Sequence, residues 1–322
     1  MLRGVIAVAL CVGCYSPAFG PGTPCETDCP GDLVCIDRVC REPGYVPDPD
    51  GGMPMQDGDG DVTIDAPDAA PGDADGDGVD NALDNCPERA NADQHNEDSD
   101  APGDVCDPCP HLTGGAIDGD GDGVGDACDP QPTIAKQMIR FFDPFTTDMT
   151  GWMHESGAGR VGETLRISGA DLSSYLMLTT GEARIAMAGT IAAIMSPAGE
   201  HQLSLIIGKN QTGNIYHYTE FYDSGGSDGE ISITKANNGT YTNLGGTSYS
   251  GTLPLGAWSM RVDQSVSSQR MGFEAKLGGI AYGPYQGSTA QAPALVAAPR
   301  LEVYVANADI RLDYFIVIET MP

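Results

Sequence analysis

The chain has 322 residues, with 46 Asp and Glu against 16 Lys and Arg, which gives a formal net charge of −30 at pH 7. This length allows one sizeable domain with several smaller modules, and the sign of the charge excludes nucleic acid as a partner. The ten cysteines, none of them after residue 128, indicate an oxidising compartment in which disulfides stabilise segments that have little apolar core.

The first 13 residues, 1–13, have the pattern of a signal peptide. Arg3 precedes a short apolar run that cannot cross a membrane by itself. The end of this run, LCVGC, is similar to the lipobox of bacterial lipoproteins and implies lipid attachment at Cys14. A lipid anchor would then be the only membrane contact of a protein at the outer membrane or cell surface. Ordinary signal cleavage near Gly20 is the alternative.

Residues 14–40 form a second segment, whose cysteine-rich part is CETDCPGDLVCIDRVC at residues 25–40. So short a stretch cannot enclose a core, so we expect two disulfides to hold this knot, with three possible pairings. A zinc site is the alternative, although the spacing lacks two close CxxC pairs. We favour the crossed pairing common in small knots, which joins Cys25 with Cys35 and Cys29 with Cys40.

Residues 41–72 are rich in Pro, Gly, Asp and Ala and contain almost no apolar side chains. This composition predicts an extended linker whose like charges repel one another. Asp57 to Asp68 come close to the spacing of a calcium loop, but Val62 stands where glycine is needed, so a weak calcium site is the alternative.

Residues 73–130 carry oxygen-bearing side chains at the spacing of calcium-binding loops. A hard cation needs six to eight oxygens, and alternate residues on a tight turn can direct several carboxylates inward. Positions one, three, five, nine and twelve are filled three times, at a period of 22 to 23 residues. The predicted metal ligands are Asp73, Asp75, Asp77, Asn81 and Asp84 in the first loop, Asn96, Asp98, Asp100, Asp104 and Asp107 in the second, and Asp118, Asp120, Asp122, Asp126 and Asp129 in the third.

Cysteines recur in register with these loops, and no apolar helical stripe flanks them, so a helix–loop–helix pair is not expected. The segment resembles thrombospondin type 3 repeats, which wrap backbone around Ca²⁺ with almost no hydrophobic core. The resemblance covers less than a fifth of the chain and implies Ca²⁺ as the bound ion. We expect the disulfides Cys86–Cys106 and Cys109–Cys128. A disordered acidic linker is the alternative.

Residues 131–322 differ in composition, with fewer acids and more β-branched and aromatic residues. Alternation of apolar and polar residues predicts half-buried antiparallel strands, and Asn237-Asn238-Gly239 predicts a hairpin turn. The expected fold class is mostly β, an antiparallel jelly-roll-type β-sandwich after an irregular repeat stalk. The strands are expected within residues 164–167, 175–178, 184–187, 202–207, 215–218, 231–234, 258–262, 272–275, 301–305 and 312–317.

Three stretches of this domain look like a concanavalin-like or laminin-G-like jelly roll. They are FDPF with the later Gly-Trp pair (residues 142–152), GAWSMRV (residues 256–262) and LDYFIV (residues 312–317). That superfamily includes lectins, adhesion modules and glycan hydrolases, so the fold alone does not select a function.

No catalytic residues are expected in the sandwich. Glycan hydrolases of this fold carry Glu-x-Asp-x-(x)-Glu on one strand, whereas the nearest acids here, Glu220 and Asp223, are three residues apart and would face opposite sides. We interpret both as strand-end or loop residues. The histidines also show no zinc motif.

Aromatic residues clustered near residues 216–222 are the candidate ligand-binding residues, because aromatic rings stack on sugar faces. They are Tyr216, Tyr218 and Tyr222, and a place in the core is the alternative. Trp258 is expected in the core.

Together these features predict a secreted, lipid-anchored surface protein that is not an enzyme. A calcium-stiffened stalk would carry a sandwich that recognises a polysaccharide or a matrix or surface protein. An extracellular glycan hydrolase and a purely structural spacer are the alternatives. Two acids about 5–10 Å apart in an open groove would favour the hydrolase, and a face without a pocket would favour the spacer.

Overall fold

The structure is a computed structural model of the whole chain. It describes residues 34–36, 39–41, 72–147, 151–178, 180–196, 199–207, 215–225, 228–288 and 300–321. The chain divides into a unit of residues 1–71 and a unit of residues 72–322. None of the described residues form a helix long and apolar enough to cross a membrane.

The first unit is described only at two short strands, β1 (Val34–Ile36) and β2 (Val39–Arg41). They pair antiparallel, with the backbone of Cys35 opposite that of Cys40. The predicted signal peptide, Cys14, Cys25, Cys29 and nearly all of the linker lie outside the described residues, as do the side chains of Cys35 and Cys40. The predicted pairing of these four cysteines therefore stays a prediction.

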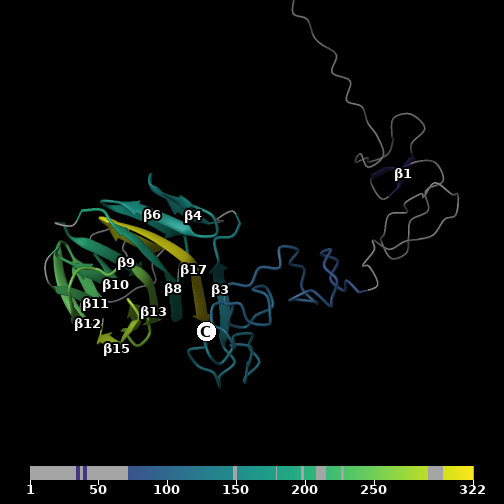
Figure 1. Cartoon of the computed structure of the whole chain (residues 1–322). Coiled ribbons are helices and arrows are strands. Elements are labelled where there is room, and N and C mark those ends of the chain that lie inside the picture. The colour runs from purple at the N-terminus through teal and green to yellow at the C-terminus, as the bar shows by residue number, and fades with distance from the viewer. Residues whose placement is uncertain are drawn as a thin grey trace, which may run out of the picture. The chain divides into compact units, whose positions relative to one another are not determined.

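The second unit begins with the predicted repeat segment, which consists of turns and bends up to residue 136 (Figure 1). Strands begin only at β3 (Gln137–Asp143). This contrast follows from composition, because a segment with so few apolar side chains cannot form the half-buried face that a sheet needs.

The remaining residues form two antiparallel sheets, which confirm the predicted mostly β sandwich. The seven-stranded sheet has the order β12-β11-β10-β9-β16-β7-β4. Its strands are β4 (Trp152–His154), β7 (Leu172–Leu176), β9 (His201–Ile207), β10 (Ile215–Asp223), β11 (Asp228–Asn237), β12 (Thr240–Ser250) and β16 (Leu301–Ala306).

The eight-stranded sheet has the order β15-β14-β13-β8-β17-β6-β5, and β3 also pairs with β17. Its long central strands are the apolar runs that the sequence predicts. The strands are β5 (Ala158–Arg160), β6 (Leu165–Gly169), β8 (Ala183–Ile194), β13 (Gly256–Ser265), β14 (Arg270–Leu277), β15 (Ile280–Ser288) and β17 (Ala308–Thr320).

The core lies between the sheets, where alternate residues of both meet. In the seven-stranded sheet Leu203, Phe221 and Val303 are among the inward side chains, and all three are fully buried. Trp258 of β13 is 2% exposed, as predicted for a core residue. The residues between them along each strand therefore point to the opposite face of the sheet.

The predicted hairpin turn joins β11 and β12, with Asn237 opposite Thr240. Asn238 and Gly239 between them both have positive φ, of 50° and 80°. Asn and Gly are the residues that adopt this backbone most readily, which explains why the sequence signal was correct.

The end of the repeat segment packs against the outer side of the eight-stranded sheet. Cys109, Val124 and Cys128 form one buried apolar cluster with Ile316 and Ile318 of β17. In Figure 1 the C-terminus likewise lies beside the repeat loops. The end of the described repeat segment and the sandwich therefore share one buried apolar cluster.

Candidate metal loops and ligand groove

The first and third predicted loops repeat one geometry, which is set by hydrogen bonds at fixed loop positions, whereas the second loop keeps only the bond from Ser99 N to Asn96 Oδ1 at 2.8 Å. At position one, Asp73 Oδ1 accepts from Gly76 N at 2.8 Å and Asp73 Oδ2 accepts from Gly78 N at 3.0 Å. Asp118 repeats both contacts in the third loop. Gly78 has a φ of 95°, so the glycine at position six provides a turn that other residues rarely adopt.

The carboxylates at positions three and twelve each use one oxygen in the loop and leave the other buried without a hydrogen-bond partner. In the first loop, Asp75 Oδ1 accepts from Asp77 N at 3.3 Å and Asp84 Oδ1 accepts from Cys86 N at 2.8 Å, whereas both Oδ2 atoms have no partner. A buried carboxylate oxygen without a partner is costly unless a cation binds it. The other loops repeat these unpartnered atoms at Asp98 and Asp107 and at Asp120 and Asp129.

Three carboxylates converge in each loop, with ligand oxygens that all lie within 4.8 Å of one another. These triads fit a hard cation, which prefers several carboxylate oxygens. Asp84 and Asp129 lie outside the triads, and Asn96 donates from Nδ2 to Asp100 O at 2.8 Å. The triads are Asp73, Asp75 and Asp77, then Asp98, Asp100 and Asp107, and then Asp118, Asp120 and Asp122.

The side chains at position nine have a contact that spacing alone does not reveal. Each accepts a hydrogen bond from the backbone N–H at position two and so closes the loop. The pairs are Asn81 Oδ1 with Ala74 N at 2.8 Å, Asp104 Oδ1 with Glu97 N at 2.9 Å and Asp126 Oδ1 with Gly119 N at 2.8 Å. Metal binding by these three residues stays a prediction.

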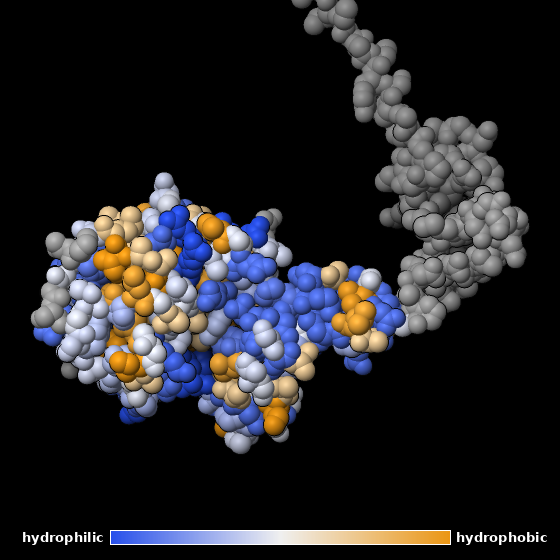
Figure 2. All heavy atoms as spheres, viewed as in Figure 1, coloured by the Kyte–Doolittle hydropathy of each residue, from blue (hydrophilic) through white to orange (hydrophobic). Residues whose placement is uncertain are grey.

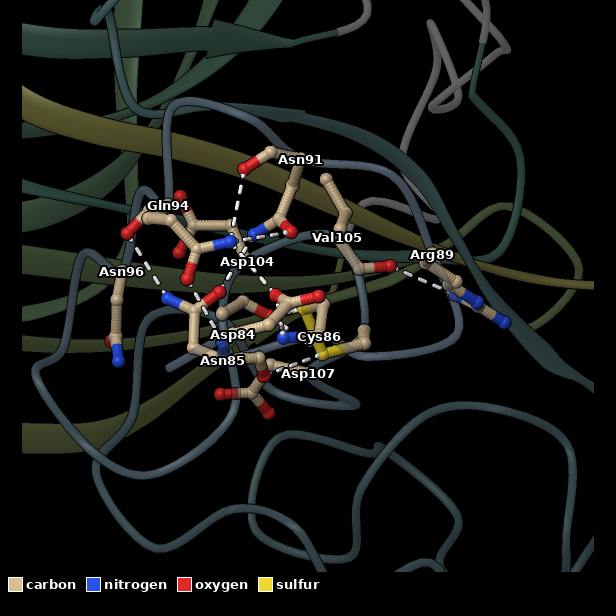
Figure 3. The surroundings of a disulfide bond; sticks show 12 residues. Asp84, Asn85, Cys86, Arg89, Asn91, Gln94, Asn96, Asp104, Val105 and Asp107 are labelled. Carbon is tan, nitrogen blue, oxygen red and sulfur yellow. Dashed lines mark hydrogen bonds between the residues drawn. A yellow bond between two sulfur atoms is a disulfide. The ribbon is translucent and has the colours of Figure 1, made fainter. Parts of the chain in front are cut away.

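The disulfides Cys86–Cys106 and Cys109–Cys128 are both present and confirm the predicted pairs. Figure 3 shows the surroundings of the first, where a polar network replaces an apolar core. Its centre is Gln94, which donates from Nε2 to Asp84 Oδ1 at 2.7 Å and accepts from Asn85 N at 2.9 Å. The side chain of Gln94 thus holds the position-twelve carboxylate in place.

The charge of the loops is itself unfavourable. Burial, with a smaller contribution from the charges of Asp100, Asp98 and Asp104, raises the pKa of Asp107 to about 6, although the hydrogen bond from Cys109 N lowers it. A bound divalent cation would relieve this repulsion. Figure 2 shows hydrophilic side chains interrupted by apolar patches on the visible face of the described repeat segment. Leu83 and Ile117 of this segment are exposed, consistent with a segment that lacks a core of its own.

A groove with a volume of about 830 Å³ lies on the outer face of the seven-stranded sheet. Its floor consists of side chains in rows that cross the strands. In the central row, Ser204 of β9 lies between Tyr304 of β16 and Glu220 of β10, and Ser232 of β11 follows Glu220. Neighbouring rows lie about 7 Å away, two residues along each strand.

Glu220 is one of the two most enclosed carboxylates of the groove, with 7% of its surface exposed against 5% for Glu302. The Glu220 carboxylate accepts hydrogen bonds from Gln202 Nε2 at 2.7 Å, from Ser232 Oγ at 3.1 Å and from Thr234 Oγ1 at 3.3 Å. Burial raises the pKa of Glu220 to about 7, with a smaller contribution from the charge of Glu230. The side chain is therefore rigidly held and close to its titration point at neutral pH.

The interpretation of Glu220 as a strand-end or loop residue is wrong, because it lies in the middle of β10 and faces the groove. The chain alternates there, so Tyr218 and Tyr222 line the groove beside it, whereas Phe221 is fully buried in the core. Asp223 ends β10, as expected, and is fully buried against His201 Nδ1 at 3.0 Å.

The three candidate ligand-binding tyrosines differ in where the structure places their side chains. Tyr218 packs on Ile206 and is only 6% exposed, so its ring forms part of the floor. Tyr222 lines the groove, and the side chain of Tyr216 lies outside the described residues. Tyr241 and Tyr304 also line the groove.

The groove is acidic, a feature that the sequence pattern did not predict. The described residues that line it include no Lys, Arg or His. Its six carboxylates come from six different strands and loops, so no local motif indicates them. The complete set of acids is Glu155, Asp171, Glu200, Glu220, Glu230 and Glu302.

The geometry of the loops agrees with a family comparison. Residues 56–94 match the thrombospondin type 3 repeat. The match contains the first loop and begins within the segment interpreted as a linker, so the type 3 repeat extends toward the N-terminus beyond residue 73. It ends before the second loop, which begins at Asn96. Type 3 repeats bind calcium, and the aspartate triads can hold such an ion. No curated protein matches the chain.

Solved structures resemble the sandwich. The CBM2 module of Lactobacillus casei BL23 phage J-1 evolved Dit has a TM-score of 0.44 at 8% identity and covers 58% of this chain and 97% of its own. Carbohydrate-binding module CBM66 of Bacillus subtilis has a TM-score of 0.38 at 13% identity, with 52% and 96% covered. Bacillus licheniformis β-glucanase has a TM-score of 0.38 at 10% identity, with 56% and 97% covered. At these identities the likeness concerns the fold alone.

Proposed function

We propose that the repeat segment binds Ca²⁺ and that the ion orders it into a stalk. The observation that carries this proposal is the recurrence of a buried, unpartnered carboxylate oxygen at positions three and twelve of every loop. The ion supplies the positive charge that these oxygens lack. The aspartates of the three triads would hold it, together with the carboxylates at position twelve.

Calcium titration of the full chain tests this proposal. Asp75→Asn and Asp120→Asn each remove charge at position three of one loop, and each should weaken binding at its own loop about tenfold or more. Asp228→Asn, in the sandwich, is the matched control and should leave calcium affinity unchanged. Equal affinity of the wild type and both loop variants would refute the assignment.

We propose that the sandwich binds an extracellular polysaccharide in its groove. The groove supports this because it combines tyrosine rings with amide and hydroxyl groups across several strands, a composition suited to chains of sugar hydroxyls. Because the rows cross the strands, a chain ligand could extend over β11, β10, β9 and β16.

A glycan array with the full chain in calcium tests this role. Tyr222→Ala should reduce binding to any glycan found, because it removes a groove ring. Ile280→Ala, an exposed side chain on β15 of the other sheet, should not. A matrix or surface protein as ligand would appear as retained protein binding with an empty glycan array and would contradict the polysaccharide role.

A glycan hydrolase is the second candidate, because a carboxyl with a pKa near 7 in a groove is suited to act as a general acid. Glu230, the diagonal neighbour of Glu220 and about 7–8 Å away on β11, also gives the pair of acids expected of a hydrolase. We propose that the chain binds without cleavage. Prolonged incubation with bound glycans should release no new reducing ends. Release that Glu220→Gln abolishes would establish the hydrolase instead.

We propose that a lipid on Cys14 anchors the protein at the outer membrane or cell surface, as the LCVGC pattern implies. Cys14→Ser should move the protein into the soluble fraction. A variant that stays in the membrane fraction would contradict the anchor.

A further inference from the structure

We propose that the groove selects glycans that carry several positively charged amino groups, in preference to neutral or acidic glycans. The inference rests on the proposed polysaccharide role of the same groove and adds the class of sugar. It follows from the charges that line the groove and from how far apart they lie.

The charge of the groove is almost uncompensated. Of its carboxylates, Glu302 pairs with Arg300 Nη2 at 2.8 Å, at the edge of the groove. Among the described residues, the ion pairs of Lys and Arg do not involve the other five. Lys235 lies next to Thr234 on β11 and therefore points to the other face of the sheet. Among the described residues that line the groove, an anionic glycan would meet only like charge.

The carboxylates are spread along the groove and do not converge on one point. In the part of the chain that the structure describes, groups of three or more acidic side chains close enough to share one metal ion occur only in the three repeat loops. Glu220 lies opposite Ser232 and Glu230 lies opposite Tyr222, so these two acids are diagonal neighbours about 7–8 Å apart. Such spacing suits separate cationic groups along a chain, whereas a single ion needs converging oxygens.

The neutral groups of the groove favour a sugar chain over a basic peptide. Ser232, Thr234 and Gln202 hold the Glu220 carboxylate in a fixed place, and Tyr218 and Tyr222 line the groove from the positions on either side of it on the same face of β10. An amino group on a sugar ring would meet this carboxylate while the ring lies against a tyrosine. A flexible lysine side chain would lose more conformational entropy in making the same contact.

The test compares ligands that differ in charge but not in ring or linkage. The full chain, saturated with Ca²⁺ at physiological ionic strength, is titrated calorimetrically with the β-1,4-linked hexamer of glucosamine, with its fully N-acetylated counterpart and with hexalysine. The variants are Glu220→Gln and Glu230→Gln in the groove. Glu163→Gln, an exposed acid outside the groove, is the control for net charge. Thermal melting establishes that each variant is folded.

We expect the glucosamine hexamer to bind at least tenfold more tightly than the acetylated hexamer, and each groove variant to weaken it about tenfold, as for loss of a charged hydrogen bond. Glu163→Gln should have no such effect, which separates groove binding from attraction to the acidic repeats. Acetylated and free hexamers that bind equally would overturn the charge selection and leave the polysaccharide role standing. If hexalysine binds more tightly than the glucosamine hexamer, and Glu220→Gln weakens that hexalysine binding, both the charge selection and the polysaccharide role would be overturned. Equal losses in Glu163→Gln and the groove variants would also refute the selection.

Discussion

Asp122 Oδ2 accepts a hydrogen bond of 2.6 Å from the backbone N–H of Gln137, the first residue of β3. Asp122 belongs to the third metal triad, so one carboxylate joins the last loop to the first strand of the sandwich. The aspartates at the same position of the earlier loops accept equivalent hydrogen bonds inside the repeats. Asn91 N donates to Asp77 Oδ2 and Gly114 N donates to Asp100 Oδ2, both at 2.6 Å. The carboxylate at position five of each loop is thus hydrogen-bonded to the backbone of the segment that follows that loop.

Replacement of Asp122 should therefore destabilise the sandwich as well as its own loop. Asp122→Ala leaves the N–H group of the buried Gln137 without its acceptor, at a cost of about 1–3 kcal/mol. Asp100→Ala is the matched control, because its acceptor contact lies within the repeats. Denaturant unfolding followed at the sandwich tryptophans should separate the two variants, and equal stabilities would contradict the coupling.

The two disulfides should differ in what they stabilise. On the chain-entropy model, each disulfide closes a loop and thereby stabilises the folded state by about 3 kcal/mol. Cys109 and Cys128 also pack with Ile316 and Ile318 of β17, whereas Cys86 does not belong to that cluster. The double variant Cys86→Ser, Cys106→Ser should weaken only the ordering of the repeats, measured as the calcium concentration needed for protease resistance.

The double variant Cys109→Ser, Cys128→Ser should in addition lower the melting temperature of the sandwich, because it places hydroxyl groups in a buried apolar cluster. The same melting temperature for both double variants would contradict the packing contact. Calorimetric scans at saturating calcium make the comparison direct.

Glu220 should make the sandwich less stable as pH rises. Its pKa is raised to about 7 in the folded chain from 4.5, so between these values the folded state binds more protons than the unfolded state. The contribution of Glu220 to the free energy of unfolding is therefore fully present below about pH 4.5. It is lost as pH rises through 7, by on the order of 3 kcal/mol in total. Glu220→Gln should flatten the fall in unfolding free energy between pH 5 and 8. An unchanged slope would show that Glu220 titrates normally.

Local patterns were enough to predict the loops and most strands. Side-chain spacing sets the loop geometry directly, which is why Asp75 and Asp84 point inward as expected and why the cysteine register gave the correct disulfides. The apolar runs of β8 and β17 were also readable, because each contributes alternate residues to the core.

The groove could not be predicted in the same way. Glu155, Glu230 and Glu302 meet only because the order of the strands brings distant segments together. β12 was missed for a second reason, since its sequence TYTNLGGTSYS has no apolar alternation and most of it is solvent-exposed. Long-range pairing, and not local propensity, determines both features.

The most direct test of the account is proteolysis of the full chain with proteinase K in excess Ca²⁺, in EDTA, and in EDTA followed by renewed Ca²⁺. Bound Ca²⁺ should keep residues 72–130 resistant, because coordination free energy replaces the missing apolar core. EDTA should open this segment to cleavage while the sandwich from Ile139 onward persists on its own core, and renewed Ca²⁺ should restore resistance. A repeat segment that resists the protease equally in EDTA and in Ca²⁺ would show that calcium does not hold the repeats together.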